Sequence, residues 1–420
     1  MDSRQGTMAM LRRNRALRRV LAALAVSQLG DWLYNLALLA FVYDRTHSVT
    51  WTAATTAARA LPMVLLGPLG GVLADRYDRR RLMIASDVVR AGTMVLLAVV
   101  AAAGLPVVLA PVLAAASTAA SAVYPPSVAA TVPRMCRDAD LPAANALRSM
   151  IQSVSVIVGP AGGALLLLLG SPTWAFLLNA ATFAASALVL AGLAPGRLFA
   201  PPATDAKAAG VLRELRAGVL ALRADSVACR IVGADIMCSA AYGALTVLML
   251  LLSRGLGHGD AGYGYLLAGF GVGGLAGAAM AARLRVRNPR GTVGATLLVV
   301  AASPALLAFT PSLAVALVLA VAFGAGTVMV EVVVDTALVR RLDETVLARA
   351  YGLAYPASIG GIVAGSLAAA PLVGWFGTSG ALVATGGAVA AYAVWPALPT
   401  ARRRPAQPAA ESAPVRVDTI

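Results

Sequence analysis

Five ionisable side chains stand out among those that lie inside long apolar stretches of the sequence, where charge is unusual and chemistry becomes conceivable. They are Asp31, Arg59, Asp235, Glu331 and Asp335. In a bilayer each would cost about 2.5–3.5 kcal/mol on insertion scales unless it were paired or faced water. Charges that persist in such places are typical of ion and proton pathways. We therefore treat all five as candidate proton-coupling residues.

Asp31 and Arg59 stand near the middle of the first and the second apolar stretch. Side chains at matching depth in neighbouring helices can meet, so we expect these two to form an ion pair. A carboxylate that gains and loses an arginine partner can take up and release a proton during a cycle. The alternative is a static pair that only holds two helices together.

Glu331 and Asp335 are four residues apart, so on a helix they share one face. Two carboxylates that close can share a proton. Asp335 could instead hold an inner gate against Arg340 or Arg341, which leaves Glu331 as the better cavity residue. Asp235 could either answer a neighbouring arginine or line the inner vestibule.

Several uncharged polar or aromatic side chains also fall inside the apolar stretches. Any of them could line a substrate cavity, although most residues of this kind simply bridge helices. We take as cavity candidates Gln28, Trp32, Asn35 and Gln152. Arg90 and Arg148 lie closer to the ends of their stretches, where we expect them to extend toward the membrane surface.

The elements that must position these residues are membrane helices. Of the 420 residues 59% are hydrophobic and 13% charged, against about 25% charged in soluble domains. A spanning helix needs about 20 apolar residues, and the sequence offers twelve such stretches in two groups of six. The expected spans are 20–43, 49–73, 83–103, 106–127, 144–169, 173–194, 227–252, 261–282, 292–309, 313–338, 351–375 and 379–398.

The basic residues predict the orientation. Most of the 34 lysines and arginines fall in segments that lie on one side if the N-terminus is inside, and the opposite loops keep only Arg45 and Arg254. This is the positive-inside pattern, with both termini cytoplasmic in the plasma membrane. The net charge of +15 then reports topology and contact with anionic lipids, and nucleic acid is not an expected partner.

The chain divides accordingly into five parts. The linker contains VLRELRAGVLALR, whose apolar stripe predicts an amphipathic helix on the membrane surface; the alternative is a solvated connector. We expect a basic N-terminus (1–19), a first six-helix bundle (20–194), this cytoplasmic linker (195–226), a second bundle (227–398) and a disordered tail (399–420).

The turn between the second and third spans reads GVLADRYDRRR, residues 71–81. It resembles motif A of the major facilitator superfamily, G-x-L-a-D-r-x-G-r-k, with Asp78 where the family has glycine. The resemblance implies a cytoplasmic gate that latches the two halves together. Its matching residues are Gly71, Asp75, Arg76, Arg79 and Arg80. We expect Gly71 to permit close helix approach and Asp75 to accept from a neighbouring helix start.

The fifth span carries SVIVGPAGGALL, similar to the antiporter motif C of the same superfamily. The matching residues are Gly159, Pro160, Gly162 and Gly163, which let a helix bend and a neighbour pack closely. Further stretches, such as SQLGDWLYNLAL and LLNAATFAAS, resemble the branch with enterobactin exporters and macrolide efflux proteins. This implies the major facilitator fold, an all-α membrane protein of two pseudo-symmetric six-helix bundles.

The favoured function is proton-coupled efflux of a small amphiphilic compound, such as a drug, antibiotic or siderophore, by a monomer. A proton-coupled importer or a non-transporting sensor or scaffold are the alternatives. An enzyme is disfavoured, because two histidines and three cysteines form no metal or nucleophile pattern. No GxxxxGK[ST] loop occurs, so ATP is not the direct drive, and no cofactor or metal is expected.

Overall fold

The computed structural model describes residues 10–137, 140–167, 171–196, 198–200, 226–283, 289–341 and 344–397. Within these ranges the chain is helical with short connections, as the sequence predicts. The expected linker helix at 211–223 and the tail at 399–420 lie outside the described residues.

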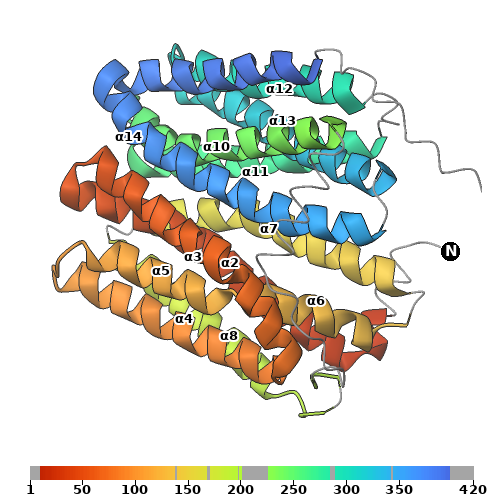
Figure 1. The fold of residues 1–420 in the computed structure, drawn as a ribbon. Helices are drawn as coiled ribbons and strands as arrows, with labels where there is room; N and C mark the ends of the chain where they lie inside the picture. Colours follow the sequence, from red (N-terminus) through yellow and green to blue (C-terminus); the bar gives the residue numbers. More distant parts are fainter. Residues whose placement is uncertain are drawn as a thin grey trace, which may run out of the picture.

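The helices fall into an N-terminal and a C-terminal group, which occupy the lower and the upper part of Figure 1. The first group comprises α2 (Arg15–Thr46), α3 (Val49–Arg76), α4 (Arg79–Ala102), α5 (Leu109–Ser121), α6 (Tyr124–Met135), α7 (Leu141–Leu167) and α8 (Thr173–Ala191). The second comprises α10 (Ser226–Gly255), α11 (Gly259–Arg283), α12 (Pro289–Leu307), α13 (Leu313–Arg341) and α14 (Glu344–Ala397).

Seven helices in the described part of the chain are long and apolar enough to cross a membrane, and the bent helix α3 would make an eighth. Large apolar side chains are exposed along the outer faces of both groups, among them Leu65, Val88, Leu188, Leu298 and Val318. Apolar surface of this extent is what lipid, rather than water, would cover.

Three expected spans differ in detail from the helices observed. The stretch 106–127 is divided between α5 and α6, because the prolines that follow Tyr124 begin a new helix at positions that need no backbone N–H. The stretches 351–375 and 379–398 both lie in α14, where Gly377 adopts φ 68° and turns the chain between two helical parts. Only glycine takes this conformation without strain.

Small residues allow α7 to lie against two neighbours. A Cβ atom on Gly159 would meet Trp32 of α2, and one on Gly163 would meet the Leu33 carbonyl. On the other side, Gly271 of α11 packs on Val156 and Ile157 of α7. The antiporter-like stretch thus serves close helix packing, with its glycines against α2 of the same group and Val156 and Ile157 against α11 of the C-terminal group.

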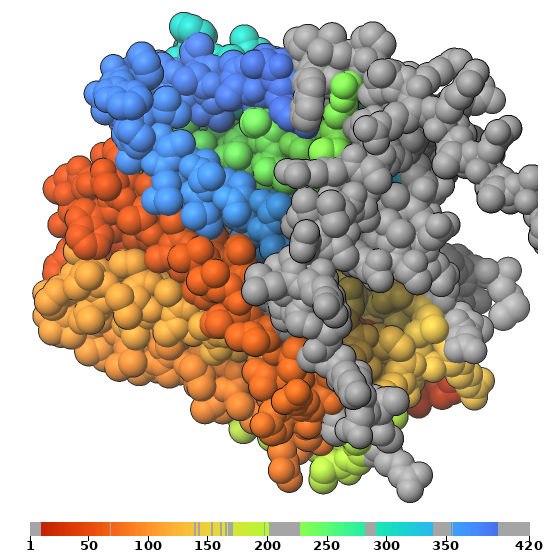
Figure 2. All heavy atoms as spheres, in the orientation of Figure 1, coloured from red at the N-terminus to blue at the C-terminus, as the bar shows by residue number. Residues whose placement is uncertain are grey.

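The two groups meet along α3 and α14 and along α7 and α11. Figure 2 shows the atoms of α3 and α14 side by side on the described part of the visible face. The apolar core of the C-terminal group extends onto Leu36 and Leu39 of α2 and Ala53 of α3. These residues lie toward the end of the bundle where α2 finishes, so the groups are packed together at that end.

The packing of α7 predicts a contrast between two adjacent glycines. Gly163→Ala should destabilise the protein by about 1–3 kcal/mol, because the new methyl group enters the α2 backbone. Gly162→Ala is the control, since its Cβ would meet only Leu33 Cδ1 at 3.7 Å. Both changes gain the same helix propensity, so thermal unfolding of the purified proteins isolates the packing effect. Equal melting temperatures would contradict the close approach.

Candidate functional site

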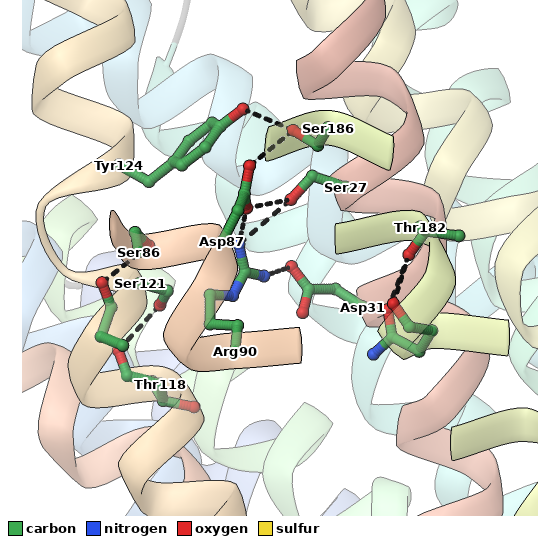
Figure 3. A network of polar contacts seen from close by, with 12 residues as sticks. Ser27, Asp31, Ser86, Asp87, Arg90, Thr118, Ser121, Tyr124, Thr182 and Ser186 are labelled. Carbon is green, nitrogen blue, oxygen red and sulfur yellow. Dashed lines mark hydrogen bonds and ion pairs between the residues drawn. The ribbon is translucent and has the colours of Figure 1, made fainter. Parts of the chain in front are cut away.

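Arg90 of α4 holds two carboxylates at once in the N-terminal group (Figure 3). One guanidinium nitrogen, Nη2, is ion-paired with Asp31 of α2. The other, Nη1, lies 3.3 Å from Asp87 Oδ1, one helical turn earlier on α4. We call Asp31, Asp87 and Arg90 the ionic triad.

Neighbouring side chains of α2, α6 and α8 hold the triad in place. Ser186 of α8 donates to Asp87 Oδ2 at 2.5 Å, and the hydroxyl of Tyr124 lies 3.4 Å from Ser186 Oγ. Arg90 Nη1 also donates to Ser27 at 3.1 Å, and the guanidinium carbon lies 3.9 Å from the centre of the Phe183 ring. The aromatic face attracts the cation and excludes water from it.

The three members differ in their access to water. The side chain of Asp87 is fully buried and that of Arg90 is 4% exposed, whereas Asp31 is 34% exposed. A charge taken out of water is retained only when its partners replace the lost hydration. The triad therefore has an open end at Asp31 and a closed end at Asp87.

The predicted pairing of Asp31 with Arg59 is wrong, because Arg90 takes the carboxylate. Arg59 of α3 interacts instead with the hydroxyl of Tyr34, and its Nε is buried without a hydrogen-bond partner in the described structure. The expectation that Arg90 extends to the membrane surface is also wrong. Its helix turns the side chain inward, onto Asp31 and Phe183.

Sequence reasoning missed Asp87. The available signal was the stretch SDVVR, which places an acid and an arginine three residues apart inside an expected span. On a helix that spacing puts both side chains on one face. An acid with an arginine one turn away on the same helix has a partner that can balance its charge inside the membrane. Such an acid should therefore be counted as a candidate functional residue.

In the C-terminal group, Asp235 of α10 and Glu331 of α13 line one cavity of about 130 Å³. We call it the carboxylate cavity. Asp235 Oδ2 accepts from Ser358 of α14 at 2.5 Å. Glu331 interacts electrostatically with both Asp235 and Asp335. Thus two of the five candidate residues line this cavity, with Asp335 close enough to interact with Glu331, and Asp31 belongs to the triad.

The four polar cavity candidates lie elsewhere. Asn35 is buried, with both amide atoms unpartnered in the described structure, and Gln28 has an unpartnered Oε1. Trp32 packs at Gly159, and Gln152 is exposed on α7. The carboxylate cavity is lined by other residues.

The turn between α3 and α4 is held within the N-terminal group. Asp78 caps α4 by accepting from the Arg81 backbone N–H at 2.9 Å, which explains why an acid can replace the family's glycine. Arg79 Nε donates to the Ala74 carbonyl at 3.0 Å. Arg80 donates to the Leu190 and Ala191 carbonyls, at the C-terminal end of α8, where a helix favours a cation.

Three other residues of this turn form no hydrogen bond or ion pair with the C-terminal group in the described structure. Asp75 is 67% exposed and lies 3.6 Å from Arg79, while Arg76 is exposed. Gly71 has open space where a Cβ would be, so the expected close approach there is wrong. Its neighbour Gly70 makes that approach, against the Ala122 carbonyl.

At the other end of the bundle, Arg254 of α10 joins the two groups. Its Nη1 lies 2.7 Å from Asp44 of α2, and its Nη2 lies 2.5 Å from Asp260 of α11. The guanidinium carbon also lies 4.7 Å from the centre of the Tyr43 ring. We call Asp44, Arg254 and Asp260 the Arg254 bridge; the sequence had marked Arg254 only as a loop charge.

Comparison with known proteins agrees with this architecture. The chain is 28% identical over 299 residues to the putative bacilysin exporter of Bacillus amyloliquefaciens, covering 71% of this chain and 74% of that protein. It is 30% identical over 146 residues to macrolide efflux protein A of Streptococcus pyogenes, covering 34% and 36%. A crystal structure of the nucleoside transporter NupG shares the fold, with TM-score 0.73 at 12% identity over 91% of this chain and 98% of that chain.

A family model named transmembrane secretion effector matches residues 5–414, nearly the whole chain. The match confirms the resemblance seen in the 71–81 turn and in α7, and with it the major facilitator fold. The protein is a multi-pass membrane transporter and not an enzyme. It belongs to the transmembrane secretion effector family of the major facilitator superfamily.

Proposed function

We propose that this transporter exports a small amphiphilic compound, such as a drug, an antibiotic or a siderophore, in exchange for protons. It works by alternating access between the two helix groups, in the plasma membrane with both termini in the cytoplasm. The observation that carries the coupling is the ionic triad, in which a single buried arginine faces two carboxylates.

The charge count of the triad favours proton binding. With both carboxylates ionised the triad has a net charge of −1, and Asp87 and Arg90 are shielded from water. Uncompensated charge in such a place is costly. One proton on either carboxylate makes the triad neutral, so proton uptake and release there are the cheapest way to change its charge.

Protons from water would reach the triad at Asp31, because it is the exposed member. In the cycle we propose, Asp31 is ionised and paired with Arg90 while the compound enters from inside. After reorientation Asp31 takes a proton from the outer solution, the pair loosens and the compound leaves. A proton moving across about 100 mV provides about 2.3 kcal/mol, equivalent to roughly fifty-fold accumulation.

The direction of transport rests on two observations. The glycine-rich stretch in α7 is of the antiporter type, and it packs at the junction of α2, α7 and α11. The relatives found by sequence are named as a bacilysin exporter and a macrolide efflux protein. Both support export over import.

Alternating access needs contacts at each end that can break. The Arg254 bridge joins the groups at the end where α2 finishes, which the arginine distribution assigns to the outside. The exposed Asp75 stands at the opposite end, where the family's latch would form. These contacts support our proposal that the end closed by the Arg254 bridge is the outer end.

The first prediction concerns the coupling acids. Asp31→Asn and Asp87→Asn should each abolish uphill export and spare downhill exchange, because the triad is then already neutral without a proton and proton uptake no longer removes an uncompensated charge. Uptake of erythromycin and other antibiotics into everted vesicles, with and without a proton gradient, measures both. Asp140→Asn, which alters only the exposed pair with Arg13, is the control, and Glu331→Gln is run alongside. Uphill export by both triad variants would make the triad structural.

The second prediction concerns the Arg254 bridge. Asp44→Arg and Arg254→Asp should each open the outer end, and the double exchange should restore it, since opposite charges again face each other. The readout is labelling of Ser239→Cys from outside intact cells by an impermeant thiol reagent, in a chain without its native cysteines. Arg45→Asp is the matched control on the same helix end. Unchanged labelling in both single variants would show that the bridge does not hold the outer end closed.

The third prediction compares two acids in one turn. Asp75→Asn should reduce transport sharply at normal membrane abundance, because the family's latch needs the charge. Asp78→Asn should have little effect, since asparagine caps a helix as well as aspartate does. Full transport by Asp75→Asn would reduce the turn to an orientation signal.

A further inference from the structure

The carboxylate cavity is lined by acidic side chains that have no part in the proposed proton coupling. Residues of α10, α11 and α13 form it, and its described lining contains no lysine, arginine or histidine. That lining is Asp235, Cys238, Ser239, Tyr242, Phe270, Thr327, Val328 and Glu331. Two acids without a cation in one concave wall create a negative potential that attracts positive ligands.

The two acids are held differently. Asp235 is fixed by the hydrogen bond from Ser358 at 2.5 Å. Glu331 lines the same cavity and is exposed, and in the part of the chain that the structure describes no hydrogen bond or ion pair is recorded for it. Its carboxylate is therefore free to accept from a ligand, beside a second carboxylate that is already in place.

An aromatic surface adjoins the acids. The rings of Tyr242 and Phe270 are stacked, with centroids 4.9 Å apart and planes 29° from parallel. Phe323 of α13 backs Phe270, with centroids 5.8 Å apart. Ring faces attract cations and apolar carbon alike, so this wall suits a positive group attached to a hydrocarbon body. Arg59 of the N-terminal group interacts electrostatically with Tyr242 but is not among the lining residues.

We propose that the carboxylate cavity binds the protonated amino group of the exported compound, with Asp235 and Glu331 accepting its N–H donors. The volume of about 130 Å³ is below the 300–1,000 Å³ of sites that enclose a whole drug-sized ligand. The cavity is a head-group subsite, and the apolar remainder of the compound lies along Tyr242 and Phe270. This inference rests on the proposed export function and names its substrate class as amines.

Charge-selective labelling tests the cavity without knowledge of the natural compound. In the full-length chain, with Cys136, Cys229 and Cys238 replaced by alanine, Ser239→Cys places a thiol in the lining. We expect methanethiosulfonate ethylammonium to react at least about tenfold faster than the anionic ethylsulfonate reagent, relative to a free thiol, since such a wall concentrates cations. Adding Asp235→Asn and Glu331→Gln should remove the preference, and adding Asp140→Asn should leave it. Equal rates on the unaltered carboxylates overturn the proposal.

Ligand protection distinguishes an organic amine from an inorganic cation, and uses the intact carboxylates. Dansylcadaverine should slow labelling of the introduced thiol, whereas its N-acetylated form and sodium chloride at equal concentration should not. Protection by the acetylated form would mean an apolar site, and protection by sodium an inorganic cation site; either overturns the proposal. The labelling measurements need no proton gradient, so they can show amine binding even if the vesicle assay shows no export. Conversely, the vesicle assay can show export even if labelling shows no amine binding, so the two proposals fail separately.

Discussion

The constraint on which the rest of the structure depends is the free-energy cost of holding a charged side chain away from water, inside the helix bundle. In hydrocarbon, backbone groups must pair within helices, and an ionised side chain needs partners that replace its hydration. Arg90 meets this requirement with two carboxylates, a serine and the face of Phe183. Helices α2, α4 and α8 each contribute a side chain to this network, so the network fixes their positions relative to one another.

Close packing makes such a network attainable. Gly30 of α2 leaves room for Asn179 and Thr182 of α8, and this approach brings Ser186 within reach of Asp87. On the same helix, the region of Trp32 and Leu33 receives the α7 glycines. Helices without bulky side chains at their contacts can thus position polar groups from several elements around one buried arginine.

The two helix groups carry different chemistry. The N-terminal group holds a triad whose charge a single proton changes, and the C-terminal group holds a cavity with two carboxylates and stacked aromatic rings. The Arg254 bridge couples the groups at one end through an ion pair that solvent can reach. Exposed pairs of this kind are worth only about 0–1 kcal/mol, which suits a contact that would break in each turn of the proposed cycle.

The sequence by itself determined that the chain lies in a membrane, where most of its helices fall, the superfamily turn at 71–81 and the acids Asp31, Asp235 and Glu331, but not Asp87. Depth along each span could be read from hydropathy, because a helix rises by a fixed step per residue. What it could not supply was the rotation of each helix and the identity of its neighbours. Asp31 therefore meets Arg90 and not Arg59, and Gly70 rather than Gly71 faces Ala122. Adjacent residues on a helix point about 100° apart, so a contact depends on packing between distant segments, and only the tertiary structure decides it.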